Sequence, residues 1–388
     1  MRWRGILLLL AAAIVVTVAL EPARVAVQTL VLLPNLLDRE PRPLDWFSRE
    51  PTRITVPYRD HGGEAAAAAG DLADLWIPHG AGAQQRVGGM LLVFGVNNLG
   101  RTHPAIERVT EALARTGVVV LVPDSATLLG GRLEVDEIEG VVQAFSLLAA
   151  RPEVDPERVG MVGFSVGGSL ALIAAADPRV AAEVRYVNAF GAYADARTYL
   201  ASVAAHAFEL DGSDVPWDPS ELTLEVSSRF LLEQVADADE RSALAAAYQS
   251  ALLGGERPEE DASLADRLGP TGRPVYDLVT ARSLDDATEA VERLPDATLR
   301  FLDAISPVRH LDGLHAHVYL MHDVADHHVP YVESRALADR LAPLGRLARH
   351  TEFRLFNHVQ PDDIDLVAAA PDLWKLLWHV HAVMVETL

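Results

Sequence analysis

Short apolar runs alternate with amphipathic helical patterns along most of this 388-residue chain. Residues 90–96 form a nearly unbroken apolar run, as in a buried strand. Residues 103–116 then place apolar side chains at helical spacing, and a second apolar run follows over residues 118–122. The unit is repeated up to a strand predicted over residues 158–164. This alternation predicts an α/β fold with a mostly parallel sheet of about eight strands and helices on both faces.

The alternation stops over residues 193–305, which are alanine-rich, acidic and helical in period. The sheet pattern resumes at residue 306, so we expect a helical cap inserted into a core of residues 52–192 and 306–388. A second independent domain is the alternative. The apolar cap residues could line an acyl site or simply pack the cap helices together; they include Trp217, Phe230, Leu231 and Tyr248.

The N-terminal residues 1–37 have the pattern of an export signal. Two arginines precede an uncharged apolar run over residues 5–20, and a second apolar stretch covers residues 25–37. Three interpretations stay open: an uncleaved membrane anchor, a removed signal peptide, or a buried helix. The first two place the remaining chain beyond the cytoplasmic membrane, as a single-pass or a secreted protein. Residues 38–51, rich in proline and charge, are predicted to be a linker.

Composition narrows the chemistry. The formal net charge is −22, so we do not expect nucleic acid as a partner. The chain has no cysteine, which excludes disulfides, thiolate catalysis and cysteine-ligated zinc.

A candidate nucleophile lies in the string G-F-S-V-G-G, residues 163–168. The string falls where a predicted strand ends and a helix of small residues begins. A serine on such a turn takes a strained backbone geometry, and glycines on either side avoid collisions with the neighbouring strand and helix. The pattern predicts that Ser165 is a nucleophile exposed at the carboxyl end of the sheet. The alternative is a plain glycine turn.

A serine hydroxyl needs a base, and the base needs a carboxylate that fixes its tautomer. His358 follows the strand predicted over residues 352–356 and precedes a last helix predicted from Pro361, so it is our candidate base. It could equally be a solvated surface residue. Asp323 and Asp326 both follow the strand predicted over residues 317–321 and are the candidate acids.

The segment H-D-V-A-D-H-H-V-P, residues 322–330, resembles the H-G-x-x-D-x-x-V-P stretch of α/β-hydrolases in the dienelactone hydrolase and prolyl oligopeptidase group. The resemblance implies that Asp326 is the triad acid, whereas Asp323 occupies the place of the family's glycine. The chain order Ser165, Asp326, His358 also matches that fold. The resemblance covers roughly residues 52–192 and 306–388.

Acyl transfer also needs backbone donors for an oxyanion. One is expected to be the amide of Val166, directly after the nucleophile. The family commonly shows His-Gly after the strand at residues 90–96, but this chain has F-G-V-N-N at residues 94–98. The second donor is therefore the amide of Val96 or of Asn97.

The predicted function is hydrolysis of a carboxylic ester through an acyl-enzyme, with no cofactor and with a small-molecule ester or peptide as substrate. A serine peptidase of the same fold and a catalytically silent binding protein are the alternatives. A metal site is a further reading of the cluster at residues 322–328, but its spacing lacks a helical H-E-x-x-H pair. We therefore expect His327 and His328 to be solvated turn residues.

Overall fold

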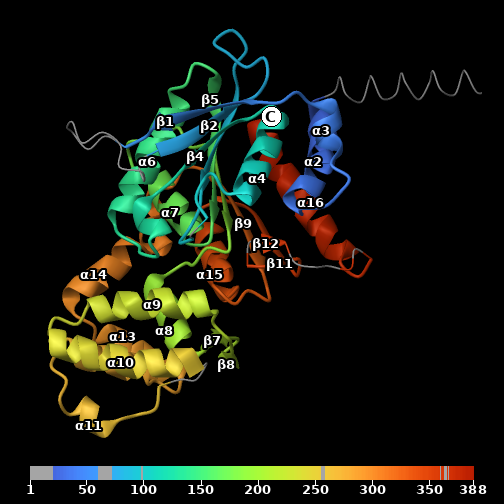
Figure 1. The fold of residues 1–388 in the computed structure, drawn as a ribbon. Coiled ribbons are helices and arrows are strands. Elements are labelled where there is room, and N and C mark those ends of the chain that lie inside the picture. Colours follow the sequence, from blue (N-terminus) through green and yellow to red (C-terminus); the bar gives the residue numbers. More distant parts are fainter. Residues whose placement is uncertain are drawn as a thin grey trace, which may run out of the picture.

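The structure, a computed structural model, describes residues 21–59, 72–97, 99–254, 258–358, 360–361, 365 and 367–388. Among these residues, eight strands form the main sheet, in the order β1-β2-β4-β3-β5-β6-β9-β10 (Figure 1). The strands are β1 Thr52–Pro57, β2 Leu72–Ile77, β3 Val87–Val93, β4 Val119–Pro123, β5 Val154–Phe164, β6 Tyr186–Phe190, β9 His317–Asp323 and β10 Leu347–Phe353.

The sheet is parallel from β4 to β10, and only β2 runs against its neighbours β1 and β4. Register is continuous across the centre, where Gly163 of β5 pairs with Val93 of β3 and with Ala189 of β6. The predicted fold class is therefore confirmed. Because the central strands are parallel, their carboxyl ends meet at one edge, and the loops that follow them can share one site.

Helices cover both faces of the sheet (Figure 1). Apolar residues of α6, α7 and α15 pack on one face, and those of α4 and α16 pack on the other. Buried strand residues on both faces are almost all apolar, as expected for strands covered by helices on each side. The helices of the core are α4 Pro104–Arg115, α5 Ala126–Leu129, α6 Asp136–Ala149, α7 Val166–Ala175, α15 Val332–Leu341 and α16 Ala370–Thr387.

Residues 193–305, which we call the cap, form a helical layer beyond the carboxyl edge of the sheet (Figure 1). The layer has an apolar core of its own, to which Leu231 and Tyr248 contribute buried side chains. A short hairpin, β7–β8, interrupts the helices; the helical period of the sequence did not reveal it. The cap elements are α8 Ala196–Ala205, β7 Ala207–Leu210, β8 Ser213–Pro216, α9 Glu221–Glu233, α10 Ala238–Gly254, α11 Ala262–Ala265, α12 Gly272–Val279, α13 Leu284–Glu292 and α14 Asp296–Ala304.

The folded body begins before Thr52, which corrects the predicted boundary. Helix α2, Glu21–Leu36, packs against α16 and α4, and its Leu32 side chain is fully buried. Helix α3, Pro43–Phe47, lies within the predicted linker and buries Leu44. Hydropathy cannot distinguish a buried helix from a membrane segment, since both are apolar. No helix among the described residues is long and apolar enough to cross a membrane, and residues 1–20 lie outside the described part.

The segment after β10 also differs from the prediction. The strand predicted at residues 352–356 ends earlier, at Phe353, and a two-residue strand β11, Phe356–Asn357, pairs with β12, Gln360–Pro361. The last helix was expected from Pro361, but α16 begins at Ala370. His358 therefore lies in the turn of a short hairpin (Figure 1).

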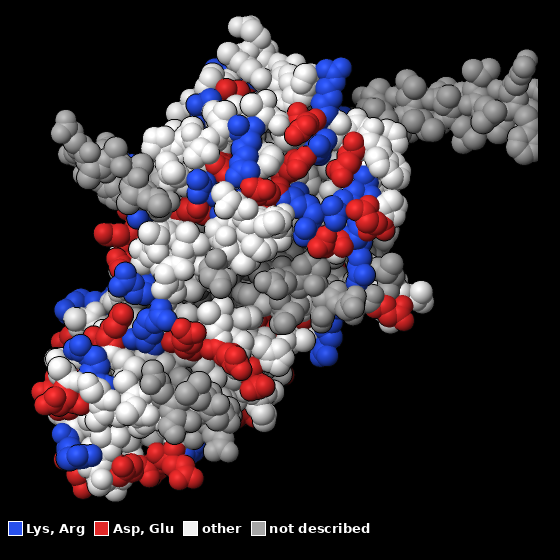
Figure 2. All heavy atoms as spheres, viewed as in Figure 1, with Lys and Arg blue, Asp and Glu red and all other residues white. Residues whose placement is uncertain are grey.

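Acidic and basic side chains are interspersed on the face of the molecule shown in Figure 2, on core and cap alike. Several acidic residues form ion pairs, as between Arg335 and Glu352 at 2.6 Å and between Arg197 and Asp303 at 2.7 Å. Pairs on the surface contribute little to stability, so the fold depends mainly on its apolar cores.

The burial of α2 yields a stability prediction. Replacing Leu32, which is 0% exposed, with alanine should lower the free energy of unfolding by about 2–5 kcal/mol because it opens a cavity between α2 and the core. Leu30 lies on the same helix but is 58% exposed, so Leu30→Ala should change the free energy of unfolding by less than about 0.5 kcal/mol. Urea denaturation of both variants measures the difference. Equal effects would mean that α2 does not pack on the core.

Candidate active site

Ser165 lies on a sharp turn between β5 and α7. Its φ is 56°, a region that non-glycine residues rarely occupy. A Cβ atom on Gly163 would come within 2.4 Å of the Gly167 carbonyl oxygen, and one on Gly167 within 2.2 Å of the Val93 carbonyl oxygen. The turn can therefore form only with glycine at these two positions, which is the physical content of the sequence motif.

Asp326 and His358 are in direct contact although they come from different loops. Oδ2 of Asp326 lies 2.5 Å from Nδ1 of His358, and both side chains are buried. The other carboxylate oxygen, Oδ1, accepts hydrogen bonds from the amides of His328 and Val329 at 2.6 and 3.0 Å. These hydrogen bonds fix the carboxylate in the orientation in which Oδ2 contacts the imidazole of His358.

Two opposing effects act on the Asp326 carboxyl. Burial alone would raise its pKa, but the positive charge and hydrogen bond of His358 and the hydrogen bond of His322 lower the pKa well below its usual range. Nε2 of His322 lies 3.3 Å from Oδ2 of Asp326 and 2.9 Å from the carbonyl oxygen of Val329. Asp326 is thus an anion wherever the protein is folded near neutral pH.

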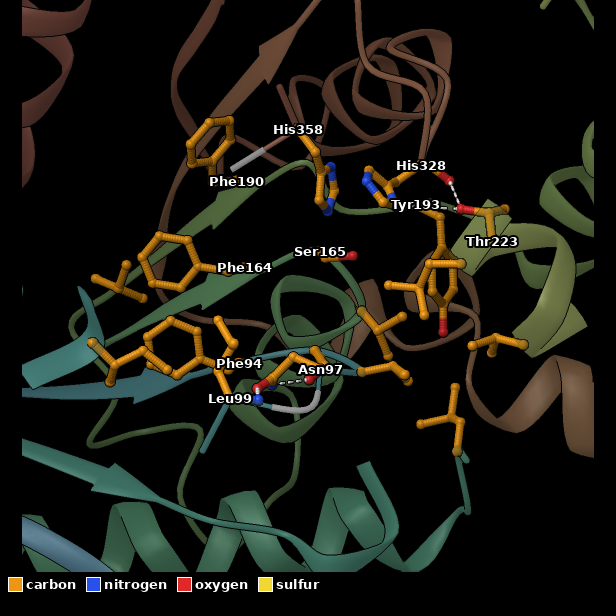
Figure 3. A pocket seen from close by; sticks show the side chains of 18 of the residues that line it. Phe94, Asn97, Leu99, Phe164, Ser165, Phe190, Tyr193, Thr223, His328 and His358 are labelled. Atoms are coloured by element: carbon orange, nitrogen blue, oxygen red, sulfur yellow. Dashed lines mark hydrogen bonds between the residues drawn. The ribbon is translucent and has the colours of Figure 1, made fainter. Parts of the chain in front are cut away.

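The second ring nitrogen of His358 is available for chemistry. Nε2 is buried and has no hydrogen-bond partner among the described residues. Figure 3 shows the ring standing over Ser165, with this nitrogen directed toward the serine. No hydrogen bond joins these two side chains in the described structure. Gly191, with φ of 65°, makes room for the ring, since a Cβ atom there would lie 3.0 Å from Cε1 of His358.

Asp323, the alternative acid, has different partners. Its carboxylate accepts hydrogen bonds from the amides of Ala325, Leu355 and Phe356, at 2.8, 2.6 and 2.9 Å. Burial raises its pKa, and these amides counteract that effect only in part. Asp323 thereby ties the turn that carries Asp326 to the segment just before His358.

The loop of residues 94–97, which is predicted to supply the second oxyanion donor, lies directly against the elbow. A Cβ atom on Gly95 would come within 3.0 Å of the amide nitrogen of Val166. The Asn97 amide donates to the carbonyl oxygen of Leu128 at 3.4 Å, whereas no hydrogen bond from the Val96 amide to another described residue is present. Of the two predicted second donors, the amide of Val96 is the one without a described partner.

His328 was predicted to be solvated, but it is packed into the site. Its ring centroid lies 4.5 Å from that of His358, and its Nδ1 lies 2.8 Å from Oγ of Ser220 in the cap (Figure 3). Burial, together with the nearby His358, lowers the pKa of His328 to about 4, so it is neutral at pH 7. The only sequence signal for this packing of His328 into the site was its position two residues after Asp326.

Further hydrogen bonds join the cap to the turn that carries Asp326. Nε1 of Trp217 donates to the carbonyl oxygen of Asp326 at 2.8 Å, and the amide of Ser220 donates to the carbonyl oxygen of His327 at 2.7 Å. The hydroxyl of Tyr199 donates to the carbonyl oxygen of His328 at 2.8 Å. Nδ1 of His327, which is exposed as predicted, lies 2.8 Å from the carbonyl oxygen of Asp218. We call these contacts, with the Ser220–His328 bond, the cap clasp.

Comparisons with known proteins agree with this geometry. Residues 126–206 match the dienelactone hydrolase family, and they include the Ser165 elbow. Over this segment the chain is similar to that family. A comparison of the sequence with curated proteins gives no match.

Solved structures that are similar to this chain have low sequence identity to it. Dipeptidyl peptidase 4 of Porphyromonas gingivalis is 11% identical, with a TM-score of 0.49 over 88% of this chain and 36% of that one. A puromycin-hydrolyzing peptidase of Mycobacterium tuberculosis is 15% identical, with a TM-score of 0.48 over 88% and 40%. An esterase of Pyrobaculum calidifontis is 14% identical, with a TM-score of 0.46 over 93% and 88%. The chain thus spans less than half of these two peptidase chains.

The edge of the sheet that carries Ser165 opens into a cavity of about 1460 Å³ between core and cap. Ser165, His358 and His328 line it, and so does Phe230 of the cap. Of the four apolar cap residues considered for an acyl site, Phe230 alone is among the lining residues. Most of the other lining side chains are apolar; those nearest the elbow and the cap include Phe94, Val96, Phe164, Val166, Phe190, Tyr193, Leu200, Leu222, Val226, Phe301, Leu302 and Ile305.

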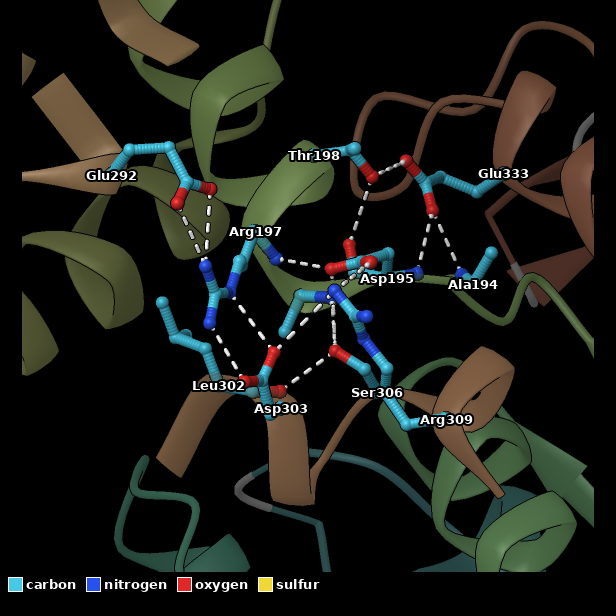
Figure 4. A network of polar contacts seen from close by, with 11 residues as sticks. Ala194, Asp195, Arg197, Thr198, Glu292, Leu302, Asp303, Ser306, Arg309 and Glu333 are labelled. Carbon is cyan, nitrogen blue, oxygen red and sulfur yellow. Dashed lines mark hydrogen bonds and ion pairs between the residues drawn. The ribbon is translucent and has the colours of Figure 1, made fainter. Parts of the chain in front are cut away.

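The two chain crossings between the sheet core and the cap are joined by a polar network (Figure 4). Glu333 of α15 accepts hydrogen bonds from the amides of Ala194 and Asp195, at 2.8 and 3.3 Å, where the chain enters the cap. Oγ of Ser306, at the point where the chain leaves the cap, accepts a hydrogen bond from the amide of Ala196 at 2.8 Å. Burial raises the pKa of Glu333 to about 7, although these amides lower it.

The raised pKa of Glu333 predicts a pH-dependent stability. The folded protein binds this proton more tightly than the unfolded chain, so the stability contributed is fully present below about pH 4.5 and is lost as pH rises through 7. The gap in unfolding free energy between wild type and Glu333→Gln should therefore change by about 3 kcal/mol between pH 4.5 and 8, in favour of the variant at high pH. Urea denaturation over this range measures the gap; parallel curves would contradict the assignment.

Proposed function

We propose that this protein hydrolyses carboxylic esters through a covalent acyl-enzyme on Ser165. One observation carries the proposal. The imidazole of His358 is held by Asp326 at 2.5 Å, and its free Nε2 faces the cavity that contains a serine on a strained turn. A nucleophile, a base and an orienting carboxylate in this relation are the elements of serine hydrolysis.

The reaction begins when the Ser165 hydroxyl turns toward Nε2 of His358, which requires a change of one side-chain torsion. Nε2 takes the hydroxyl proton as the serine oxygen attacks the ester carbonyl. The imidazolium then gives that proton to the leaving alcohol, and the acyl group stays on Ser165. A water molecule, activated by the same histidine, releases the acid in the second half of the reaction.

The negative charge of each tetrahedral intermediate falls beside two backbone amides. Val166 is the first residue of α7, where amides have no intrahelical acceptor. The Val96 amide lies in the loop packed against it, so the two amides are the proposed oxyanion donors. Asp326 stabilises the imidazolium, and His328 adds no opposing charge because its pKa of about 4 keeps it neutral.

An apolar site favours an ester over a peptide. The side chains around Ser165 include Phe94, Phe164 and Phe190, which form a continuous aromatic series with ring centroids 5.0 and 6.3 Å apart. Such a surface binds a hydrocarbon group well and offers no partner to peptide amides and carbonyls. The competing functions, a serine peptidase and a silent binding protein, become outcomes of the test below.

We also propose that the protein is held at a membrane by its first twenty residues, with the hydrolase domain beyond the cytoplasmic membrane. The apolar run at residues 5–20 and the preceding arginines support this location. Since α2 packs on the core, the anchoring part ends before Glu21. Exposed aromatic residues on α3 and α16, among them Trp46, Phe47 and Trp374, suit contact with lipid headgroups. Fractionation of full-length protein and of a form starting at Glu21 tests the anchor, which only the former should retain.

The function itself is tested by Ser165→Ala. The wild type should hydrolyse nitrophenyl esters and react with a fluorophosphonate probe, whereas Ser165→Ala should lose at least 10³-fold in kcat/KM and all labelling. Ser227→Ala, which alters another serine of the same cavity, should keep both. Hydrolysis of peptide amides but not esters would indicate a peptidase, and equal turnover by wild type and Ser165→Ala would contradict the proposal.

The assignment of the acid is tested by two asparagine substitutions. Asp326→Asn keeps the shape but favours the wrong imidazole tautomer, so kcat should fall by about 10⁴-fold. Asp323→Asn should mainly lower the melting temperature, because asparagine replaces one of the two oxygens that accept from these three amides with an NH2 group, which cannot accept. A larger loss of kcat in Asp323→Asn than in Asp326→Asn, with the protein folded, would reverse the two roles.

A further inference from the structure

The residues that line the cavity at Ser165 fall into two groups, and we name a part of the cavity after each group. One part, which we call the cap arm, lies between the elbow and cap residues such as Val226 and Phe301. The other, which we call the sheet arm, lies between the strands of the core and helices α4 and α16. Its walls include Val162 and Met321 from the strands, Val109 from α4 and Val380 from α16.

The sheet arm occupies a place that side chains normally fill. Protein interiors are packed as densely as organic crystals, and empty spaces larger than a few waters are rare. Here the aromatic rings of Phe94 and Phe164 stack on each other but are only partly buried, because they face the cavity. At about 1460 Å³, the whole cavity exceeds the usual range of roughly 300–1,000 Å³ for small-molecule sites.

Polar groups in the middle of the sheet arm are already engaged. His379 bonds Asn188 through Nε2 and Thr351 through Nδ1, each at 2.8 Å. Burial lowers the pKa of His379 to about 3, so the ring is neutral. Among the lining residues near the end of α2, the charged side chains are those of Asp38, Arg39 and Arg108, and Asp38 and Arg108 form an ion pair at 3.0 Å. The arm thus offers its occupant a mainly apolar wall.

The two ends of the sheet arm define the shape of that occupant. At the near end the lining residues are Phe164, Phe190 and Phe356, together with His358 and Ser165. Figure 3 shows Phe164 and Phe190 beside His358 and Ser165. The far end lies at the end of α2, where Leu36 and Asp38 line it, and Asp38 is exposed. The lining residues thus extend from Ser165, between the sheet and helices α4 and α16, to the exposed Asp38. A flexible, unbranched hydrocarbon chain fits an arm with this lining.

We propose that the sheet arm binds the acyl chain of a long-chain carboxylic ester, with the ester carbonyl at Ser165 and the alcohol part in the cap arm. The inference rests on the proposed function, because it assigns the acyl side of the same reaction. Each methylene group moved from water to the apolar wall contributes to binding, so longer acyl chains are hydrolysed with higher kcat/KM until the arm is filled.

The test narrows the arm with single Val→Phe substitutions, in the full-length protein. Val380→Phe and Val109→Phe enlarge two side chains that line the arm from different helices. Val385→Phe makes the same change on α16 at a residue that is 55% exposed and does not line the cavity. Val226→Phe enlarges a cap-arm residue instead. Thermal melts of all four variants establish that each is folded.

We expect wild type and Val385→Phe to prefer nitrophenyl palmitate over nitrophenyl butyrate. Val380→Phe or Val109→Phe should lower kcat/KM for nitrophenyl palmitate at least tenfold and leave kcat/KM for nitrophenyl butyrate within twofold of the wild-type value. A loss confined to the long chain in Val226→Phe alone would place the chain in the cap arm and overturn the proposal. Equal losses for both esters in the two sheet-arm variants, or no loss at all, would also overturn it.

A binding measurement separates this inference from the proposed function. In the Ser165→Ala background, palmitate should raise the melting temperature, and adding Val380→Phe should abolish the rise while Val385→Phe preserves it. If no ester is hydrolysed but this pattern holds, the proposed function fails and the sheet arm stands as a binding site. If palmitate gives no shift, or the same shift in all three proteins, the sheet arm is not an acyl site even where short esters are hydrolysed.

Discussion

The contact between Oδ2 of Asp326 and Nδ1 of His358 joins two loops that are 32 residues apart in the sequence. Several features of the fold serve this contact. Parallel strands bring both loops to the carboxyl edge of the sheet, and Gly191 leaves the space that the imidazole occupies. Asp323 binds the segment before His358 and so fixes the distance between the loops. A buried carboxylate and imidazole would each be costly alone, but together they satisfy one another.

The same edge combines a rigid site with an incompletely filled interior. The elbow, the loop of residues 94–97 and the acid turn are all fixed by backbone hydrogen bonds and close glycine contacts. Directly behind them, the cavity extends between the sheet and helices α4 and α16. An unfilled interior costs dispersion contacts, which packing elsewhere must offset. Helix α2 contributes to that packing, since Leu32 extends the apolar cluster on this side of the sheet.

The fold and the elbow could be predicted because their signals are local. Alternating apolar runs predicted the sheet, and the string G-F-S-V-G-G predicted the turn at Ser165, because neighbouring residues impose the geometry of that turn. Asp326 was selected by a family resemblance, since periodicity alone did not separate it from Asp323. Other features depend on residues far apart in the sequence and have no local pattern. The packing of α2, the position of His328 beside His358 and the sheet arm beside α4 and α16 each require side chains from several elements.

The cap clasp has a consequence for how such a protein can diverge. Trp217 and Ser220 belong to the cap, yet they hold the backbone that presents Asp326 to His358. Inserted segments usually vary freely because they are remote from the chemistry. Here, mutations that remodel the start of α9 to suit a new substrate also disturb the acid of the site. Changes in substrate recognition are therefore restricted to cap positions outside this segment. Related proteins that replace the segment need other contacts to support the carboxylate of Asp326.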